Sequence, residues 1–589
     1  MNPETKTCQN CKNPFTIEPE DFKFYEKADV LPPKLCPDCR LQLRMLFRNE
    51  RIFYKRKCDL CGKNMISCYA PEYISPVFCQ KCWWSDKWDP FQYGKDYALS
   101  RPFFEQYKEI LYSVPVITLM NDDGIGSINC EYTYDWAFSK NCYLAVCGWF
   151  NENVAYGYNI NHCKDTVDCW NVNHSELMYQ SVNSERCYGC RYCQLCFDSR
   201  NCFLGIDLRN CSDCIMCVGL RNKQYCILNK QYSKEEFLRK KQEMRLEIRE
   251  MIEKYLHDFQ EFSLKFPRKF AYMLKSVNST GNNLINCKNS KNSFFYPDLE
   301  DCRYMVVGDG AKDTYDCNNT GHPQLCYNCV TPDNSYGSVG SIFCWKCNKV
   351  EYSNNCHSSD NLLGCSGLKK SFYAILNKKY SKEDYIVMRE RIVNQMKGAG
   401  DWGEFLPRSL SQFAYNESAA QEWFTLTNDG ALAQGFRWRE PDDRNYAVTV
   451  PPDRVPDEIS KASDDILNEI IGCAHQGLCG EPCTTAFKVI PQELEFYRKM
   501  NIPLPILCPN CRHYARLKLR NSPKLRHRTC QCAGRKSEIR STKSETPIYE
   551  NTATHFHGEN PCPNEFETSY APERQEIVYC EACYNSEIV

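Results

Sequence analysis

Three consecutive stretches near the start of the chain decide the fold: CQNCKNPFTI (residues 8–17), FYEKADVLPPKLCPDCR (24–40) and LRMLFRNERIFYKRKC (43–58). They recur near the end as CGEPCTTAFKV (479–489), FYRKMNIPLPILCPNCR (496–512) and LKLRNSPKLRHRTC (517–530). Cysteines of the first copy have counterparts 472 residues later, such as Cys11 with Cys483 and Cys36 with Cys508. Agreement of spacing and residue type over this length identifies an internal duplication.

The duplication also sorts the terminal cysteines into recurring pairs. Downstream, CYAPEYISPVFCQKC (68–82) matches SYAPERQEIVYCEAC (569–583), after an insertion in the second copy. Because Cys68 is replaced by Ser569, which cannot ligate as a thiolate, Cys68 is predicted not to be a ligand. The predicted ligands of the first copy are Cys8, Cys11, Cys36, Cys39, Cys58, Cys61, Cys79 and Cys82. Those of the second copy are Cys479, Cys483, Cys508, Cys511, Cys530, Cys562, Cys580 and Cys583.

The chemistry of these pairs favours zinc. Two cysteines separated by two residues on a tight turn aim both sulfurs at one point, and two such knuckles complete a tetrahedral Cys₄ site. Four thiolates without an open coordination position are typical of a structural metal, and iron is the main competitor for such a sulfur site. We therefore expect about four Zn²⁺ ions per chain. A redox role for CxxC would need a thioredoxin-like βαβ context, which we do not find in the surrounding sequence.

Two points of the ligand assignment stay open on the residues alone. Sequential pairing would join the first knuckle to the second, whereas interleaved pairing would join the first to the third. In the second copy Cys532 could replace Cys530 as a ligand. His555 and His557, in the insertion HFHGENPC (555–562), are further candidates, against the simpler interpretation as surface histidines beside a spare thiol.

The order CxxC, Phe, Phe-Tyr and CPxCR resembles the probable zinc-ribbon family of small bacterial proteins, where one four-cysteine unit stands alone. The resemblance covers residues 8 to about 45 and, with CxxxC as the first knuckle, 479 to about 517. It implies sequential pairing, a zinc-ribbon fold and bound zinc, and it implies no activity. As a whole, the chain resembles uncharacterised multi-cysteine bacterial proteins, some labelled CaiB/BaiF (CoA-transferase) family, and no residue here supports that label.

Composition restricts the compartment and the protein class. The chain has 589 residues, a formal net charge of −1 and 42 cysteines, and is too long for a disulfide-stapled scaffold. The polar N-terminus MNPETKTCQN lacks the apolar stretch of a secretory signal, and the longest apolar-leaning run, 110–120, is far short of the ~20 residues that span a bilayer. We expect a cytoplasmic protein with reduced thiols and no membrane association. Without a Walker A, GxGxxG, GxSxG or HExxH motif, we expect no enzyme.

The middle of the chain is rich in cysteine and aromatic residues and is itself duplicated. Short runs such as NCYLAVC, VAYGYNI and CFLGIDL, separated by Asn, Asp, Ser and Gly, suit short strands stacked as the rungs of a β-solenoid-like repeat. GLRNKQYCILNKQYSKEE (219–236) recurs as GLKKSFYAILNKKYSKED (367–384). Each copy opens a helix, the first with a capping box of Ser233 and Glu236 and a stop at Pro267. The central cysteines are expected to be small buried side chains rather than metal ligands, because their spacing looks too irregular for four-ligand sets.

The predicted fold is mixed and mostly β, with zinc-ribbon or treble-clef-like modules at both termini flanking a two-part β-solenoid-like repeat region with two inserted helices. The predicted segments are a zinc module with two Cys₄ sites (1–98), the first repeat half (99–232), a helix (233–266), the second repeat half (267–380), a helix (381–398), a partly extended linker (399–470) and the second zinc module (471–589).

The segments between the second and third knuckles are strongly basic. Residues 40–57 carry seven Lys or Arg and one Glu, and residues 512–528 carry seven Lys or Arg and no acidic residue. Interleaved with aromatic side chains, they suit phosphate contact and base stacking. The alternatives are a solvated face or charge pairing with acidic residues of the same chain. The candidate nucleic-acid contacts are Arg40, Arg44, Arg48, Arg51, Lys55, Arg56, Lys57, Arg512, Arg516, Lys518, Arg520, Lys524, Arg526 and Arg528.

These observations favour a non-enzymatic zinc-binding scaffold whose basic modules contact RNA or DNA. A protein-interaction or structural scaffold with purely structural zinc is the alternative. A thiol- or metal-handling protein that uses the central cysteines is a third hypothesis. Nucleic-acid and protein partners are both open, and the oligomeric state is not encoded in any pattern recognised in the sequence.

Overall fold

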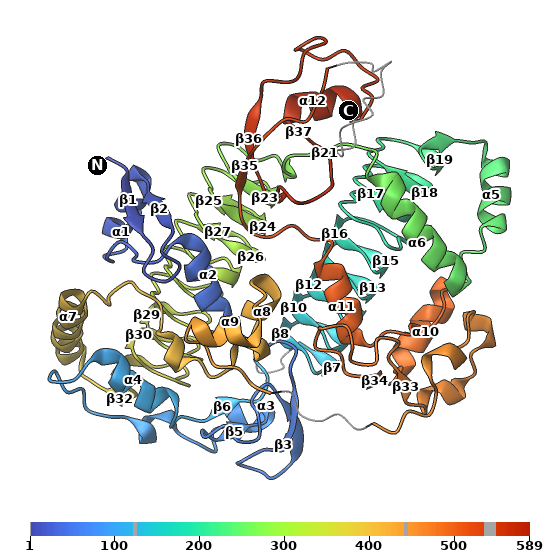
Figure 1. Cartoon of the computed structure of the whole chain (residues 1–589). Helices are drawn as coiled ribbons and strands as arrows, with labels where there is room; N and C mark the ends of the chain where they lie inside the picture. Colours follow the sequence, from blue (N-terminus) through green and yellow to red (C-terminus); the bar gives the residue numbers. More distant parts are fainter. Residues whose placement is uncertain (1, 122–125, 441–445, 535–548, 589) are drawn as a thin grey trace. The chain divides into compact units, whose positions relative to one another are not determined.

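The computed structural model describes residues 2–121, 126–440, 446–534 and 549–588, and divides the chain into two compact units (Figure 1). Unit 1 combines residues 1–123 with 272–440, and unit 2 combines 124–271 with 441–589. Each unit therefore joins one terminal cysteine module to one half of the central repeat. The N-terminal module belongs with the second repeat half, and the C-terminal module belongs with the first. The mixed fold contains many parallel strands and, in the described ranges, twelve α-helices.

Unit 1 begins with two small antiparallel hairpins, β1–β2 and β3–β4, followed by a parallel pair, β5–β6. Its strands are β1 (Glu4–Thr7), β2 (Pro14–Ile17), β3 (Tyr54–Lys57), β4 (Asn64–Ser67), β5 (Val77–Phe78), β6 (Val116–Ile117), β22 (Met273–Leu274), β23 (Gly281–Ile285), β24 (Ser293–Pro297), β25 (Leu299–Glu300), β26 (Val306–Asp309), β27 (Ala311–Lys312), β28 (Asn318–Gly321), β29 (Asn348–Glu351), β30 (Asp360–Leu363), β31 (Phe372–Ile375) and β32 (Lys378–Lys379). Its helices are α1 (Pro19–Lys27), α2 (Pro37–Met45), α3 (Gln80–Trp83), α4 (Phe103–Leu111), α7 (Lys382–Ala399), α8 (Ala420–Trp423) and α9 (Asn428–Ala433).

Unit 2 places its repeat first and its module last. Its strands are β7 (Ile128–Glu131), β8 (Tyr134–Ala137), β9 (Lys140–Tyr143), β10 (Val146–Trp149), β11 (Glu152–Ala155), β12 (Tyr158–Asn161), β13 (Lys164–Val167), β14 (Trp170–Asn173), β15 (Glu176–Tyr179), β16 (Val182–Glu185), β17 (Phe203–Ile206), β18 (Ser212–Val218), β19 (Gln224–Ile227), β20 (Lys230–Gln231), β21 (Arg268–Lys269), β33 (Ile471–Gly472), β34 (Ala486–Phe487), β35 (Arg526–Thr529), β36 (Glu565–Thr568) and β37 (Val578–Tyr579). Its helices are α5 (Lys234–Glu243), α6 (Arg249–Ser263), α10 (Pro491–Met500), α11 (Pro509–Leu517) and α12 (Glu581–Ile588).

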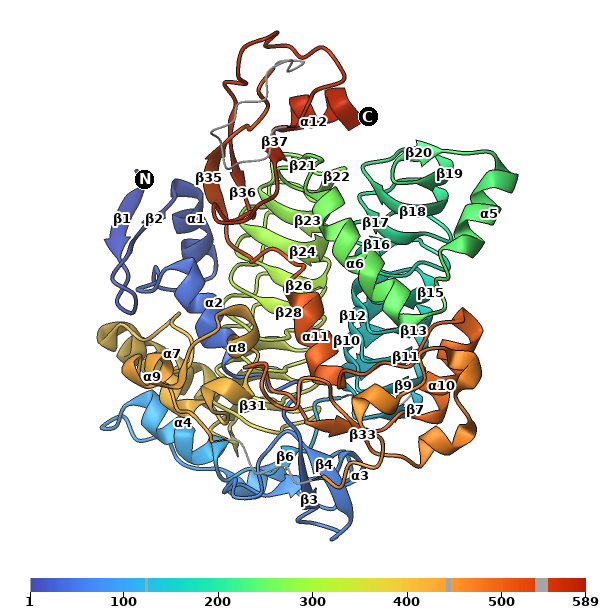
Figure 2. The ribbon, with the colours of Figure 1, turned by 45° about the vertical axis from the view of Figure 1, so that its right-hand side comes forward.

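Most central strands pair in parallel with a register of twelve residues, and β22 pairs with β23 at a register of eleven. Val146 lies opposite Tyr134 on one side and Tyr158 on the other, and the series continues through β14 and β16. Unit 1 repeats the register from β24 through β26 to β28, and Figure 2 shows these short strands stacked. Positive φ values recur at every third residue, for example at Asp135, Phe138 and Asn141. Asn and Asp tolerate this left-handed conformation better than most residues, which explains their frequency in the repeat.

The three-residue period also explains the cysteine spacing that looks irregular in the sequence. Cys187, Cys190, Cys193 and Cys196 occupy successive positions of the period, and all four are at most 3% exposed. Their thiols donate to backbone carbonyl groups, as Cys187 Sγ does to the carbonyl oxygen of Cys196 at 3.3 Å. Serines at equivalent positions accept from backbone N–H groups one twelve-residue register away, as Ser175 does from Cys187 at 3.0 Å. Small side chains thus fill the interior of the repeat, although whether any central cysteine binds metal stays a prediction.

The helices that follow the repeat halves begin where the sequence predicts. Ser233 accepts from the backbone N–H of Glu236, whose carboxylate accepts in return from Ser233, so the predicted capping box is confirmed. The expected single helix over 233–266 is instead two helices, α5 and α6, separated at Arg245 by a positive φ of 50°. The equivalent helix of unit 1, α7, begins after Ser381 and ends at a left-handed Gly400.

The segment interpreted from sequence as a partly extended linker is folded in its described parts. Residues 402–423 include the buried side chains of Trp402, Leu406 and Tyr415, and short helices occur between 408 and 433. Trp402 donates its indole N–H to the backbone oxygen of Asp29 at 2.7 Å. The part of this segment up to residue 440 therefore belongs to the core of unit 1 beside the N-terminal module, whereas residues 446–470 belong to unit 2. Of the helices in the described ranges, none has the length and apolar character that crossing a membrane requires.

Candidate metal centres

The structure brings sixteen terminal cysteines together in four sets. Within each set the Sγ atoms all lie within 4.8 Å of one another. In unit 1 the sets are Cys8, Cys11, Cys36 and Cys39, and Cys58, Cys61, Cys79 and Cys82. In unit 2 the sets are Cys473, Cys483, Cys508 and Cys511, and Cys530, Cys562, Cys580 and Cys583. The arrangement follows sequential rather than interleaved pairing of the knuckles.

Sulfur spacing in these sets matches a tetrahedral metal site. Four sulfurs around zinc at ~2.3 Å lie about 3.8 Å from one another along each edge of the tetrahedron. The Sγ–Sγ distances are 3.7 Å for Cys11 and Cys36, and 3.9 Å for Cys61 and Cys79. In unit 2, Cys473 and Cys511 are 3.8 Å apart, and Cys562 and Cys580 are 3.9 Å apart. Sulfur atoms this close, without disulfide bonds, have the spacing that a shared cation requires.

The backbone prepares each set for a charged sulfur. The N–H of Cys36 donates to Cys8 Sγ at 3.2 Å, and the N–H of Cys79 donates to Cys58 Sγ at 3.2 Å. Burial acts to raise the pKa of Cys8, but backbone N–H groups, foremost that of Cys36, lower it to about 7. The pKa of Cys58 is also lowered to about 7, because the same kind of donors outweigh its burial. One thiol in each of these two sets is therefore partly ionised near neutral pH, whereas the hydrogen bond to Cys39 raises the pKa of Cys36 and burial raises that of Cys82.

The same contact places Cys473 in the third set, at the position for which the sequence predicts Cys479. The N–H of Cys508 donates to Cys473 Sγ at 3.3 Å, as the N–H of Cys36 does to Cys8. Cys479 precedes Cys483 by a knuckle-like spacing, which is the basis of that prediction. The structure places Cys473 in the set, while Cys479 lies beside it with its Sγ 3.8 Å from that of Cys511. Nine residues separate Cys473 from Cys483, so no knuckle spacing marks it in the sequence.

The fourth set contains Cys530 rather than Cys532, and three further donor side chains lie beside it. Cys530 lies with Cys562, Cys580 and Cys583, and the N–H of Cys580 donates to Cys530 Sγ at 3.2 Å. The spare candidates form a further group in which Cys532, His555 and His557 lie with Cys583. Residues 535–548 of the insertion lie outside the described residues.

Cys68 has the environment of a core residue. It is 2% exposed, and its N–H donates to the carbonyl oxygen of Thr118 at 3.0 Å. Burial raises the pKa of its thiol well above the usual value, which opposes the thiolate form that a ligand needs. That Cys68 is not a metal ligand stays a prediction.

Most of the arginines proposed to contact nucleic acid in the N-terminal module are buried inside unit 1. Arg40 Nε donates to Asp316 Oδ1 at 2.9 Å, and Arg44 Nη1 donates to the same oxygen at 3.2 Å. Arg48 pairs with Glu50 and lies with its guanidinium 5.2 Å from the centre of the Phe343 ring. Arg40, Arg44 and Arg48 are at most 2% exposed, so they do not form a surface for phosphate.

Unit 2 repeats this arrangement with the equivalent residues. Arg512 Nε and Arg516 Nη1 lie 2.8 Å from the two carboxylate oxygens of Asp168, and Arg512 also pairs with Glu493 at 3.1 Å. Arg520 is 9% exposed, with its guanidinium 5.4 Å from the centre of the Trp170 ring. These three arginines are therefore also unavailable as a surface for phosphate. Arg512 and Arg516 pair with carboxylates of their own unit, and Arg520 lies over an aromatic ring. In both units the outcome is the alternative of charge pairing within the same chain.

Asp168 and Asp316 are the residues that sequence reasoning missed. Their signal is a third duplicated motif, KDTVDC (164–169) and KDTYDC (312–317), displaced by the same 148 residues as the two helix-opening segments. Each aspartate lies in a parallel repeat, is fully buried, and forms ion pairs with two arginines of a cysteine module. The motif therefore marks the position where a module docks onto its repeat half.

The other candidate contacts differ in exposure. Lys55, Lys57, Lys518 and Lys524 are exposed, whereas Arg51, Arg56, Arg526 and Arg528 are partly buried. Arg56 pairs with Asp59 at 3.0 Å, and Lys518 pairs with Glu481 at 3.1 Å.

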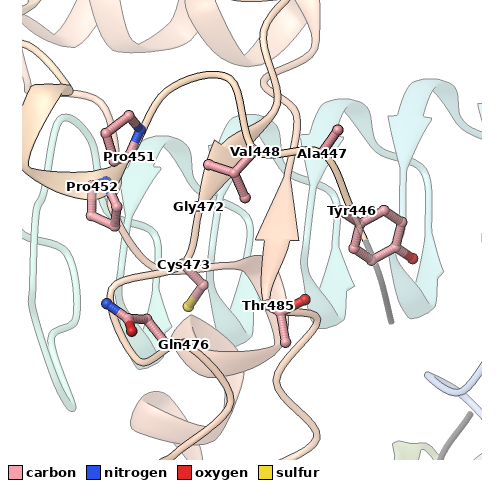
Figure 3. A pocket seen from close by; sticks show the side chains of 9 residues that line it. All are labelled: Tyr446, Ala447, Val448, Pro451, Pro452, Gly472, Cys473, Gln476 and Thr485. Carbon is pink, nitrogen blue, oxygen red and sulfur yellow. The ribbon is translucent and has the colours of Figure 1, made fainter. Parts of the chain in front are cut away.

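A pocket of about 550 Å³ lies beside the third cysteine set (Figure 3). Figure 3 shows Cys473 between Gln476 and Thr485, with Val448 and two prolines on the other side. The titratable side chains in the lining are those of Tyr446 and Cys473. Its lining residues are Tyr446, Ala447, Val448, Pro451, Pro452, Gly472, Cys473, Gln476 and Thr485.

The clusters of four cysteines within metal-binding distance are the part of the zinc-ribbon interpretation that the structure supports. Neither a protein-family model nor a curated protein matches this chain.

Proposed function

We propose that this protein is a non-enzymatic, zinc-stabilised scaffold in which four Cys₄ sites hold the terminal modules in shape. The observation that carries the proposal is the sulfur spacing of about 3.8 Å in sets supplied by knuckles of two duplicated modules. Four thiolates leave no open position for substrate, so the metal would contribute folding energy rather than chemistry. In the third site we assign Cys473 as the ligand in place of Cys479.

The docking of each module favours a structural or protein-interaction scaffold over a scaffold whose basic modules contact RNA or DNA. Six of the fourteen basic candidates, Arg40, Arg44, Arg48, Arg512, Arg516 and Arg520, are buried inside their own unit. A side chain that already pairs with a buried carboxylate cannot release counterions from a phosphate backbone. Eight candidates remain, four in each module, and Arg51, Arg56 and Lys518 among them already pair with acidic side chains.

The twelve-residue register supports a β-solenoid-like interpretation of the central region. Parallel strands at constant register let identical positions stack, as Asn141 Nδ2 does onto Asn153 Oδ1 at 3.1 Å. Each zinc-ribbon-type module would then pack against such a stack, because two of its arginines form ion pairs with one buried aspartate of the repeat half. Repeat architectures commonly serve as extended platforms for protein partners.

The test combines metal counting with partner recovery on the full chain prepared without oxygen. Elemental analysis should find at least four zinc ions, and Cys8→Ser, Cys58→Ser, Cys473→Ser or Cys530→Ser should each lower zinc binding, whereas Cys479→Ser should not. A nuclease-treated pull-down should recover a defined protein, and retention on RNA or DNA should be weak at 150 mM salt. Absence of stoichiometric metal would refute the zinc scaffold. Tight, salt-dependent retention on nucleic acid would instead support the hypothesis that the basic modules contact RNA or DNA.

A further inference from the structure

The C-terminal module contains a second group of metal-ligand side chains that touches its Cys₄ set. We propose that Cys532, His555, His557 and Cys583 bind a fifth zinc ion. The Cys583 thiolate would bridge this ion to the zinc ion held by Cys530, Cys562 and Cys580. The proposal rests on the Cys₄ zinc of the proposed function and extends it to a two-metal cluster.

The donor atoms have the spacing of a tetrahedral Cys₂His₂ site. A zinc ion with sulfur at ~2.3 Å and nitrogen at ~2.0 Å has sulfur-to-nitrogen edges of about 3.5 Å. Cys532 Sγ lies 3.5 Å from His555 Nδ1, and Cys583 Sγ lies 3.2 Å from His557 Nε2. The four ligand atoms all lie within 4.8 Å of one another. Cys583 also belongs to the Cys₄ set, and a thiolate has enough lone pairs to bind two ions.

Each histidine is oriented through the nitrogen that faces away from the group. His555 Nε2 lies 2.7 Å from Glu587 Oε1, with both side chains at most 1% exposed. His557 Nδ1 lies 2.6 Å from the carbonyl oxygen of Asn560. Metal-bound histidines characteristically place the second ring nitrogen against a carboxylate or a backbone carbonyl, which sets the tautomer and the ring orientation.

Glu587 is itself held in place from the opposite side of the loop. Its carboxylate accepts from the backbone N–H groups of Thr552 and Ala553 at 2.9–3.0 Å, and from the Thr552 hydroxyl at 2.8 Å. Helix α12 thus supplies both a ligand, Cys583, and the carboxylate that orients another. A loop of surface histidines would not need such a buried partner.

The charge balance of the proposed cluster suits the buried position of Cys532. Its side chain is 1% exposed and accepts from Asn551 Nδ2 at 3.1 Å. A buried thiolate is costly without a cation, and a second zinc ion would supply one. Five thiolates and two Zn²⁺ ions leave a net charge of −1, whereas a lone Cys₄ zinc site carries −2.

The extra group is specific to the second copy of the module. In the first copy, Cys58 and Cys61 are separated by two residues, whereas 31 residues lie between Cys530 and Cys562. That insertion brings Cys532, His555 and His557, and none of the three comes from the part outside the described residues. The duplicated modules would therefore differ in metal number, with two ions in the first and three in the second.

Native mass spectrometry of the full zinc-loaded chain tests the proposal directly. We expect five zinc ions in the unmutated protein and four in His555→Ala and His557→Ala. His527→Ala is the matched control, because His527 is an exposed histidine of strand β35 and should retain five ions. His557→Cys, which preserves a ligand, should also retain five. A count of five in His555→Ala would overturn the proposal.

Cadmium-113 NMR of the unmutated chain provides a test that does not depend on the folding of variants. Exchange of zinc for cadmium should give one resonance typical of two sulfur and two nitrogen ligands, coupled through Cys583 to one resonance typical of four sulfurs. Absence of that coupled pair would overturn the cluster. Four zinc ions, with loss of one in Cys530→Ser, would leave the proposed Cys₄ scaffold intact, whereas absence of zinc would refute both.

Discussion

Removal of the carboxylate at Asp316 should release the N-terminal module from its repeat half. Asp316→Asn keeps the size of the side chain but removes the charge that faces Arg40 and Arg44. Asp316 and both guanidinium groups are buried in the core of unit 1. The other acceptors of the two arginines are neutral, such as Asn318 Oδ1 for Arg44 and the carbonyl oxygen of Leu35 for Arg40. The change leaves two buried cations without a counter-ion.

The expected loss follows from the burial of this pair. Breaking a buried salt bridge by removing one partner costs about 3–5 kcal/mol, because the remaining charge is uncompensated. Asparagine still offers one carbonyl acceptor, so we expect a loss of about 3 kcal/mol, at the lower end of that range. The surface pair Arg239–Glu243, with both side chains about 60% exposed, is the matched control, and Glu243→Gln should cost less than about 0.5 kcal/mol.

Hydrogen exchange resolved by segment is the suitable assay, because a chain with two units need not unfold in one step. Where opening and closing are faster than chemical exchange, a loss of about 3 kcal/mol should speed exchange in α2 by about 150-fold in Asp316→Asn. Asp168→Asn should do the same in α11 of unit 2. The zinc count should stay unchanged, since neither aspartate is a ligand.

The result that would refute this reasoning is specific. If exchange in α2 of Asp316→Asn changed by less than threefold, the buried ion pair would not hold the module in place. If Asp316→Asn and Asp168→Asn each affected α2 and α11 equally, the two docking sites would not belong to separate units.

Three further predictions concern metal, packing and pH. A strong chelator with reductant should expose α2 and α11 to rapid exchange while the twelve-residue repeat keeps its protection, and equal loss in both regions would contradict local zinc stabilisation. Cys68→Ser, which copies Ser569 of the other module, should retain every zinc ion in native mass spectra, whereas loss of one would make Cys68 a ligand. Burial and the nearby Lys369 lower the pKa of His357 to about 3, below the usual 6.5, so the unfolded chain takes up a proton first as pH falls. Stability should therefore decrease between pH 6.5 and 3, by about 2 kcal/mol at pH 5, in urea titrations, and His357→Gln should remove this part of the pH dependence.

Local patterns predicted the parts of the fold that depend on local chemistry. The spacing CPDC was enough to predict that the thiols of Cys36 and Cys39 converge on one point, and Ser233 with Glu236 was enough to predict the start of α5. The duplication of the cysteine module likewise predicted that both ends would gather thiols. The twelve-residue register was missed because the repeating unit of three residues carries no fixed amino acid, only a small side chain and a left-handed backbone position.

The sequence by itself determined that thiols would gather at both ends and that small residues would fill the middle, because knuckle spacing and residue size act over a few residues. Only the tertiary structure decided which distant residues complete those sites. Cys473 lies in the third set where the sequence predicts Cys479, and the donors of the proposed Cys₂His₂ group come together across an insertion. Arg40 and Arg516 pair with aspartates that are 276 and 348 residues away in the sequence. A basic segment has the same pattern whether it faces phosphate or a buried carboxylate, and burial, which chain folding alone creates, separates the two.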